Sequence, residues 1–219
     1  PQLFGSRAFT DVNENNLHSI DVLVFEEISA GVEKYAYHRS SNTSSFDNSN
    51  PTQKTFTIPL QRSREDARYR FVILANMSQA VSTASLQFTT DKTKQQILDL
   101  IKFDVPSVWD NATPAYLPMW GENQVPVTIT RTSTGSQLGQ IKMLHSVARI
   151  DVGLNLAVDG SAFLGVSNFE LKHVQIHNNN DKAHAAPSAA ALPGFISDGK
   201  VSKPSVPTDA AKHTTELRY

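Results

Sequence analysis

The sequence has no cysteine and little excess charge of either sign, and each absence excludes a class of protein. Without cysteine, the chain cannot form disulfides, attack a substrate with a thiolate or bind metal through sulfur. The 20 basic and 21 acidic residues leave a formal net charge of -1, which gives no electrostatic reason to expect nucleic acid or an anionic membrane as a partner. No run of about 18 apolar residues is present, so no membrane-spanning helix is expected.

Catalytic sequence motifs are also missing. The chain contains no G-x-S-x-G, no phosphate-binding or dinucleotide-binding glycine motif and no H-E-x-x-H. The acidic, asparagine-rich residues 11–16 offer oxygen atoms, but they lack the glycine and the distal glutamate of a calcium-binding loop. We therefore expect a protein that is not an enzyme and that carries no metal and no cofactor.

Seven segments have the apolar pattern of β-strands. Residues 20–25 and 68–76 are apolar on both faces, which predicts central strands of a sheet. Residues 141–156 alternate apolar and polar residues, with a change of phase near residue 148 that indicates a bulge. The expected strands are residues 20–25, 32–38, 54–60, 68–76, 125–132, 141–156 and 163–178.

Only residues 91–103 have the spacing of a convincing helix, with Thr90 or Asp91 as the N-cap. Strands that do not alternate with helices predict an all-β fold. The expected architecture is an antiparallel β-sandwich of about seven strands, with Greek-key connections and one inserted helix.

The composition changes near the C-terminal end of the sequence. From residue 182 onward alanine, proline, serine and glycine predominate, which indicates an extended connection. We expect one domain at residues 1–190, followed at residues 191–219 by a linker and the start of a second, truncated β domain. The ending without a closing element suggests a piece of a longer protein.

Aromatic residues cluster after the predicted helix, at Trp109, Tyr116 and Trp120. One interpretation is a platform on which sugars stack, as in a surface glycan-binding module. The other is a plug that holds the helix and its loop against the edge of the sandwich. We favour the plug, because the W-G pair and the flanking prolines indicate a rigid turn.

Arginines are concentrated in one predicted turn, which also contains two acidic residues. One interpretation is a site for sulfate, phosphate or an acidic glycan. The other, which we favour, is a charged turn with ion pairs worth less than about 1 kcal/mol each. The arginines are Arg62, Arg64, Arg68 and Arg70, and the acidic residues are Glu65 and Asp66.

Four motifs occur in a specific order. They are R-A-F-T-D-V-N-E-N-N-L-H-S-I-D-V-L-V-F at residues 7–25, R-F-V-I-L-A-N at residues 70–76, L-P-M-W-G-E at residues 117–122 and M-L-H-S-V-A-R-I-D-V at residues 143–152. Together they resemble the N-terminal domain of the fimbrillin superfamily of Bacteroidetes, which includes fimbrial subunits and their anchors. The resemblance covers about residues 7–180.

This resemblance implies a transthyretin-like β-sandwich in an exported lipoprotein of the outer-membrane surface. It implies assembly into type V fimbriae (pili) for cell adhesion, with other fimbrial subunits as partners in a homo- or heteropolymer. Surface glycans or proteins of the host or of other bacteria are the expected ligands. Because the lipidated cysteine of the family is absent, membrane attachment is expected only through a precursor segment outside this chain.

In polymerising members an Arg-specific protease removes the first strand, and the donor strand of a neighbouring subunit fills the groove. Arg7 and Ala8 match such a cleavage site by position and chemistry. Stalk, tip and anchor proteins share this pattern, so the alternative is a glycan-binding, tip or anchor adhesin that does not polymerise.

Overall fold

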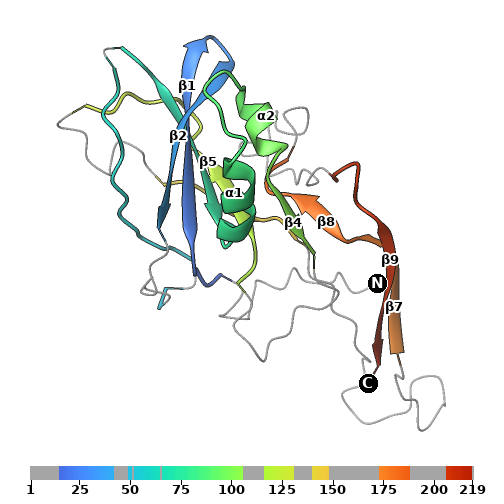
Figure 1. The fold of residues 1–219 in the computed structure, drawn as a ribbon. Coiled ribbons are helices and arrows are strands. Elements are labelled where there is room, and N and C mark those ends of the chain that lie inside the picture. Colours follow the sequence, from blue (N-terminus) through green and yellow to red (C-terminus); the bar gives the residue numbers. More distant parts are fainter. Residues whose placement is uncertain are drawn as a thin grey trace, which may run out of the picture.

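The computed structural model describes residues 15–41, 49–50, 52–64, 66–105, 116–130, 140–147, 173–187 and 206–218. In these residues strands predominate, and all the strand pairs are antiparallel. Two short helices lie beside the largest sheet (Figure 1). The prediction of an all-β fold is confirmed for this part of the chain.

The largest sheet has five strands in the order β2–β1–β3–β5–β6. β1 (Ile20–Ser29) and β3 (Tyr69–Ala75) form its centre, as predicted. Both are apolar on both faces and mostly buried, as a strand between two packed layers must be. The other strands are β2 (Val32–Ser41), β5 (Met119–Glu122) and β6 (Leu144–His145).

Alternation along the central strands directs side chains to two apolar faces. The face that we call the helical face is covered by α1 (Ser78–Ser85) and α2 (Lys94–Leu98). From the strands it contains Leu23, Phe25, Val72, Leu74 and Trp120. The opposite face, which we call the second face, contains Val22, Val24, Phe71, Ile73 and Met119.

The prediction of one helix at residues 91–103 is wrong in extent. α2 begins after Thr93, whose side chain forms a capping box with Gln96, so the N-cap is neither Thr90 nor Asp91. The helix is only five residues long, and the chain then enters the short strand β4 (Lys102–Asp104).

The prediction is also wrong in number, because α1 is a second helix. Its sequence S-Q-A-V-S-T-A-S buries only Val81 and Ala84. Two small buried residues make too weak a pattern for the helix to stand out in the sequence.

Two smaller sheets lie beyond the helical face. β4 pairs with β8 (Lys182–His184). β7 (His173–Asn180) pairs with β9 (Lys212–Arg218) to form what we call the C-terminal ribbon. Figure 1 shows this ribbon apart from the five-stranded sheet, with β4 and β8 between them. The predicted domain boundary at residue 190 lies outside the described residues, so it stays a prediction.

Several expected strands are shorter than predicted or not strands, and residues 54–60 form no strand. Of residues 141–156 only Leu144–His145 form a strand, and residues 148–156 lie outside the described residues. Residues 125–130 contain an isolated bridge from Val127 to Tyr69 but no strand. Of residues 163–178 the structure describes only the part from His173, which is β7.

Candidate functional site: the second face of the sheet

The second face of the five-stranded sheet is covered by extended segments and not by helices. Their half-buried apolar side chains pack on the buried residues of the sheet. These side chains are Phe56, Ile58, Leu60, Val127, Ile129, Ile141 and Met143. The chain therefore supplies a second layer over this face. Among the described residues, this layer contains no strand as long as the central strands of the five-stranded sheet.

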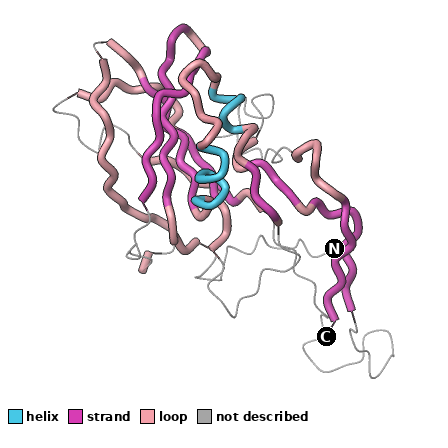
Figure 2. The backbone as a smooth tube through the Cα atoms, in the orientation of Figure 1, coloured by secondary structure: helices cyan, strands magenta, loops and turns pink. Residues whose placement is uncertain are grey.

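Residues 55–60, T-F-T-I-P-L, have the side-chain pattern of a strand without its hydrogen bonds. Phe56, Ile58 and Leu60 are half-buried, and the residues between them are exposed, as on a strand with one side on a core. No backbone N–H or C=O of these six residues is hydrogen-bonded to another described residue. Figure 2 shows the segment as a long, extended loop beside the strands. It therefore presents an unpaired strand-like backbone over an apolar surface.

The C-terminal end of this segment is fixed by two side-chain hydroxyls. The N–H of Gln61 donates to the hydroxyl of Tyr37 at 3.0 Å, and that hydroxyl donates to the carbonyl of Gln61 at 3.3 Å. Ser63 and Ile129 are joined by two bonds, one from the Ser63 N–H at 3.0 Å and one to the Ser63 hydroxyl at 2.7 Å. These bonds set the position of residues 55–60 at their C-terminal end, while the backbone of these residues has no partner among the described residues.

At β5, the second face is covered by another segment of the same chain. Residues 141–143 cross directly over Gly121 of β5. A Cβ at position 121 would lie 2.5 Å from the backbone oxygen of Lys142 and 2.7 Å from the sulfur of Met143. Only glycine permits such a close approach of two backbones.

Of the three aromatic residues of the predicted platform, the structure describes Trp120 and Tyr116, and their surroundings differ. Trp120 is 2% exposed and packs in the core of the helical face with residues of α2, as the plug interpretation expects. Tyr116 is half-buried and stacks on His18, with the ring centroids 4.7 Å apart. Trp109 lies outside the described residues. Trp120 therefore presents no face to a sugar in this structure.

The predicted cleavage site also lies outside the described residues, which begin at residue 15. Cleavage between Arg7 and Ala8 stays a prediction.

Three of the four clustered arginines form ion pairs with glutamates of the β1–β2 hairpin. The distances are 2.6 Å for Arg64–Glu26, 3.1 Å for Arg68–Glu27 and 2.7 Å for Arg70–Glu33. Guanidinium groups that are engaged by carboxylates leave little positive charge for a bound anion. The structure thus favours ion pairs over an anion site. The partners are glutamates of the sheet, whereas we expected acidic residues of the same turn.

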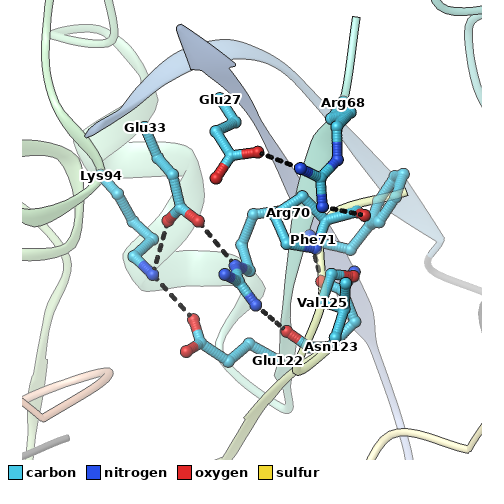
Figure 3. A network of polar contacts seen from close by, with 10 residues as sticks. Glu27, Glu33, Arg68, Arg70, Phe71, Lys94, Glu122, Asn123 and Val125 are labelled. Carbon is cyan, nitrogen blue, oxygen red and sulfur yellow. Dashed lines mark hydrogen bonds and ion pairs between the residues drawn. The ribbon is translucent and has the colours of Figure 1, made fainter. Parts of the chain in front are cut away.

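Glu33 is the centre of the most buried of these networks (Figure 3). Its side chain is 7% exposed and lies 2.7 Å from Arg70 and 2.7 Å from Lys94, and Lys94 also reaches Glu122 at 3.1 Å. Arg70 additionally donates to the carbonyl of Asn123. Burial alone would raise the pKa of Glu33, but Lys94 and Arg70 outweigh it, and the pKa lies below its usual value. The network joins β2, β3, α2 and β5.

Asp21 is a buried polar residue that the apolar pattern of β1 obscures. Its side chain accepts hydrogen bonds from the hydroxyls of Ser40 on β2 and Ser78 at the start of α1, and the residue is 1% exposed. A carboxylate needs such partners when it is buried. The only signal in the sequence is an aspartate within the run I-D-V-L-V-F.

Within the described residues no group of three or more histidine, aspartate or glutamate side chains is arranged to hold a metal ion. No helix in that part of the chain has the length and apolar character needed to cross a membrane. A scan against protein-family models found no match, and no curated protein matches the sequence. The functional assignment therefore depends on the residues and on the geometry of the second face.

Proposed function

We propose that this protein is a non-enzymatic, structural subunit of type V fimbriae, of the fimbrillin superfamily of Bacteroidetes. It assembles at the outer-membrane surface when a strand of another fimbrial subunit adds to its second face. The observation that supports this proposal is that the backbone of residues 55–60 has no partner among the described residues and lies over an apolar surface.

An extended peptide is the natural complement of such a segment. A strand that lies beside residues 55–60 supplies the missing backbone hydrogen bonds, and its inward side chains cover apolar area that is only half-buried now. This addition has no requirement for a catalytic group, a metal or a cofactor. The finer fold that we propose, a transthyretin-like sandwich with Greek-key connections, places the incoming strand in the second layer.

The rest of the proposal follows from the resemblance. Cleavage after Arg7 by an Arg-specific protease converts the exported precursor into a form that accepts a donor strand. A lipid anchor on the precursor segment holds the protein at the outer membrane before cleavage. The assembled fimbria then mediates adhesion to other cells.

Limited proteolysis of the full-length protein tests this assembly. Treatment with trypsin or an Arg-specific protease is expected to produce heat-labile ladders on a denaturing gel and filaments in negative-stain microscopy. A stable monomer after complete cleavage would contradict donor-strand polymerisation and would favour a tip, anchor or glycan-binding role.

Proline substitutions test the proposed accepting segment. Thr57→Pro removes an N–H that has no partner among the described residues, so the monomer is expected to keep its thermal midpoint while the ladders are lost. Because successive N–H groups of an extended chain point to opposite edges, Ile58→Pro tests the other edge. Thr57→Ala and Ile58→Ala retain the N–H and serve as matched controls. Normal ladders from both proline variants would refute the assignment of residues 55–60.

A glycan-binding adhesin is the second candidate, and one observation favours it. The exposed ring of His18 stacks on Tyr116 at the surface, and paired aromatic rings can bind a sugar face. If this role is correct, binding on a glycan array is lost in Tyr116→Ala and retained in Trp120→Phe, because Trp120 is buried. Absence of binding to every polysaccharide would contradict it.

A further inference from the structure

His184 is a buried histidine at the junction between the C-terminal ribbon and the core. It lies on β8 and is 9% exposed, and its Nδ1 atom is buried with no hydrogen-bond partner in the described part of the chain. The next two residues, Ala185 and Ala186, belong to the core of the helical face. Protonation of an imidazole in this position would bury a positive charge, which is costly without a partner.

The residue opposite His184 carries a positive charge. Lys102 of β4 is its cross-strand partner. The backbone bond from the Ala185 N–H to the Ile101 carbonyl, 3.0 Å long, shows that Lys102 and His184 are a non-hydrogen-bonded pair. In such pairs the opposing side chains approach most closely, and like charges directly opposite destabilise the strand pair.

The carboxylates near His184 are already engaged. Asp99, just after α2, accepts a hydrogen bond of 2.6 Å within that helix. Asp209, just before β9, forms ion pairs with Lys102 at 2.7 Å and Lys182 at 3.5 Å. Burial lowers the pKa of His184, Asp99 and Asp209 oppose this effect, and Lys102 adds to it, so that the pKa lies below its ordinary value.

We propose that His184 is an acid-sensitive latch between the core and the C-terminal ribbon. In its neutral form it allows β8 to pair with β4 and so joins the ribbon to the core. In its protonated form it opens the β4–β8 pair, while the five-stranded sheet stays folded.

The pairing between β4 and β8 is small enough for the protonation of one residue to shift its opening equilibrium. The β4–β8 ladder has only three residue pairs, and the side chain of Asp209, which joins both lysines, is 52% exposed. Half-exposed ion pairs contribute little, and small peripheral elements open more easily than the centre of a sheet.

The direction of the pH effect follows from the lowered pKa of His184. The open form takes up its proton near the ordinary histidine pKa of about 6.5, whereas the closed form takes it up only at lower pH. The latch is therefore fully closed above that pH and weakens as the pH falls. For one proton, the opening equilibrium increases by at most about tenfold between pH 7.5 and pH 5.5.

Hydrogen exchange of the whole chain, corrected for the intrinsic effect of pH, tests the latch. The reporters are the Ala185 N–H and the Val105 N–H, which donates to the Asp181 carbonyl at 2.7 Å. Their protection is expected to fall between pH 7.5 and pH 5.5, by at most about tenfold, while amides of β1 and β3 keep theirs. In His184→Leu the fall is expected to disappear, and in the control His177→Gln, an exposed ribbon histidine, it is expected to persist.

Unchanged protection of β4 and β8 in the wild type, or an equal fall in His184→Leu, would overturn the proposal. An NMR titration of the wild-type histidines gives an answer even if that variant does not fold. His184 is expected to titrate together with the loss of β4–β8 protection and below the ordinary histidine pKa of about 6.5. Titration of His184 at or above that ordinary pKa, with β4–β8 protection intact, would also overturn the proposal.

Discussion

Asn76 joins three parts of the chain at the end of β3. Its φ is +60°, a conformation that asparagine adopts more readily than most residues. Its side-chain oxygen accepts from the N–H groups of His18 and Ser19 at 2.8 and 3.4 Å, and its nitrogen donates to the carbonyls of Asn16 and Leu117 at 2.9 Å each. One amide group thus positions the approaches to β1 and β5, the strands on either side of β3.

Substitutions at this residue separate the hydrogen bonds from the backbone conformation. Asn76→Ala is expected to lower the free energy of unfolding by about 3 kcal/mol, because it loses several hydrogen bonds and places alanine in the left-handed region. Asn76→Gly loses the same bonds without the conformational cost, so it is expected to be more stable than Asn76→Ala by about 1 kcal/mol. Urea denaturation measures both values. Equal stability of the two variants would contradict the conformational part of the argument.

At the scale of elements, buried charge connects parts that are distant in the sequence. Glu33 lies on the edge strand β2, and its partners Arg70 and Lys94 lie on β3 and α2. Because a buried pair is strongly destabilised when one partner is removed, this carboxylate helps to hold α2 against the sheet. The ion pair between Glu26 and Arg64 is different, since the Arg64 side chain is 78% exposed.

The pH dependence of stability tests the role of Glu33. Because its pKa is lowered on folding, its contribution is complete above the ordinary glutamate pKa and is lost as the pH falls through the folded value. Glu33→Gln is expected to reduce the free energy of unfolding at pH 7 by about 3 kcal/mol. As the pH falls below 4.5, the free energy of unfolding is expected to decrease less in this variant than in the wild type. The control Glu26→Gln is expected to cost less than about 1 kcal/mol. If chemical denaturation at pH 7 and below pH 4.5 gives similar losses in the free energy of unfolding for the two variants, Glu33 has no special role.

At the scale of the whole molecule, burial and backbone pairing among the described residues are concentrated in the five-stranded sheet. β1 and β3 are bonded on both sides and buried on both faces, whereas residues 55–60 have no backbone partner among the described residues. Protection from hydrogen exchange depends on hydrogen bonds that open rarely.

Hydrogen exchange before and after assembly therefore gives a molecule-wide prediction. In the monomer the amides of β1 and β3 are expected to exchange most slowly, and those of residues 55–60 within seconds of mixing. In protease-assembled filaments residues 55–60 are expected to become protected. Slow exchange of residues 55–60 in the monomer would mean that their backbone is already paired, and it would contradict the proposed accepting segment.

The local sequence pattern by itself determined the all-β class and the two central strands. Residues 20–25 and 68–76 are continuous apolar runs, and such runs can only be buried between two layers. The pattern also predicted a strand at residues 54–60, which the structure does not form, although Phe56, Ile58 and Leu60 do lie on one side of the segment. Helix α1 and the true extent of α2 were not predictable in this way, since their boundaries depend on short polar segments and on a cap at Thr93.

Only the tertiary structure decided which of these patterns form hydrogen-bonded strands and which polar residues meet. Residues 54–60 alternate apolar and polar side chains, and residues 69–75 are apolar almost throughout. Only residues 69–75 pair with a strand on each side. Likewise Trp120 is buried and not a surface platform, and His184 lies opposite Lys102, because strands distant in sequence pair there. Periodicity specifies which side of a segment is apolar, but pairing depends on neighbours that the local sequence does not contain.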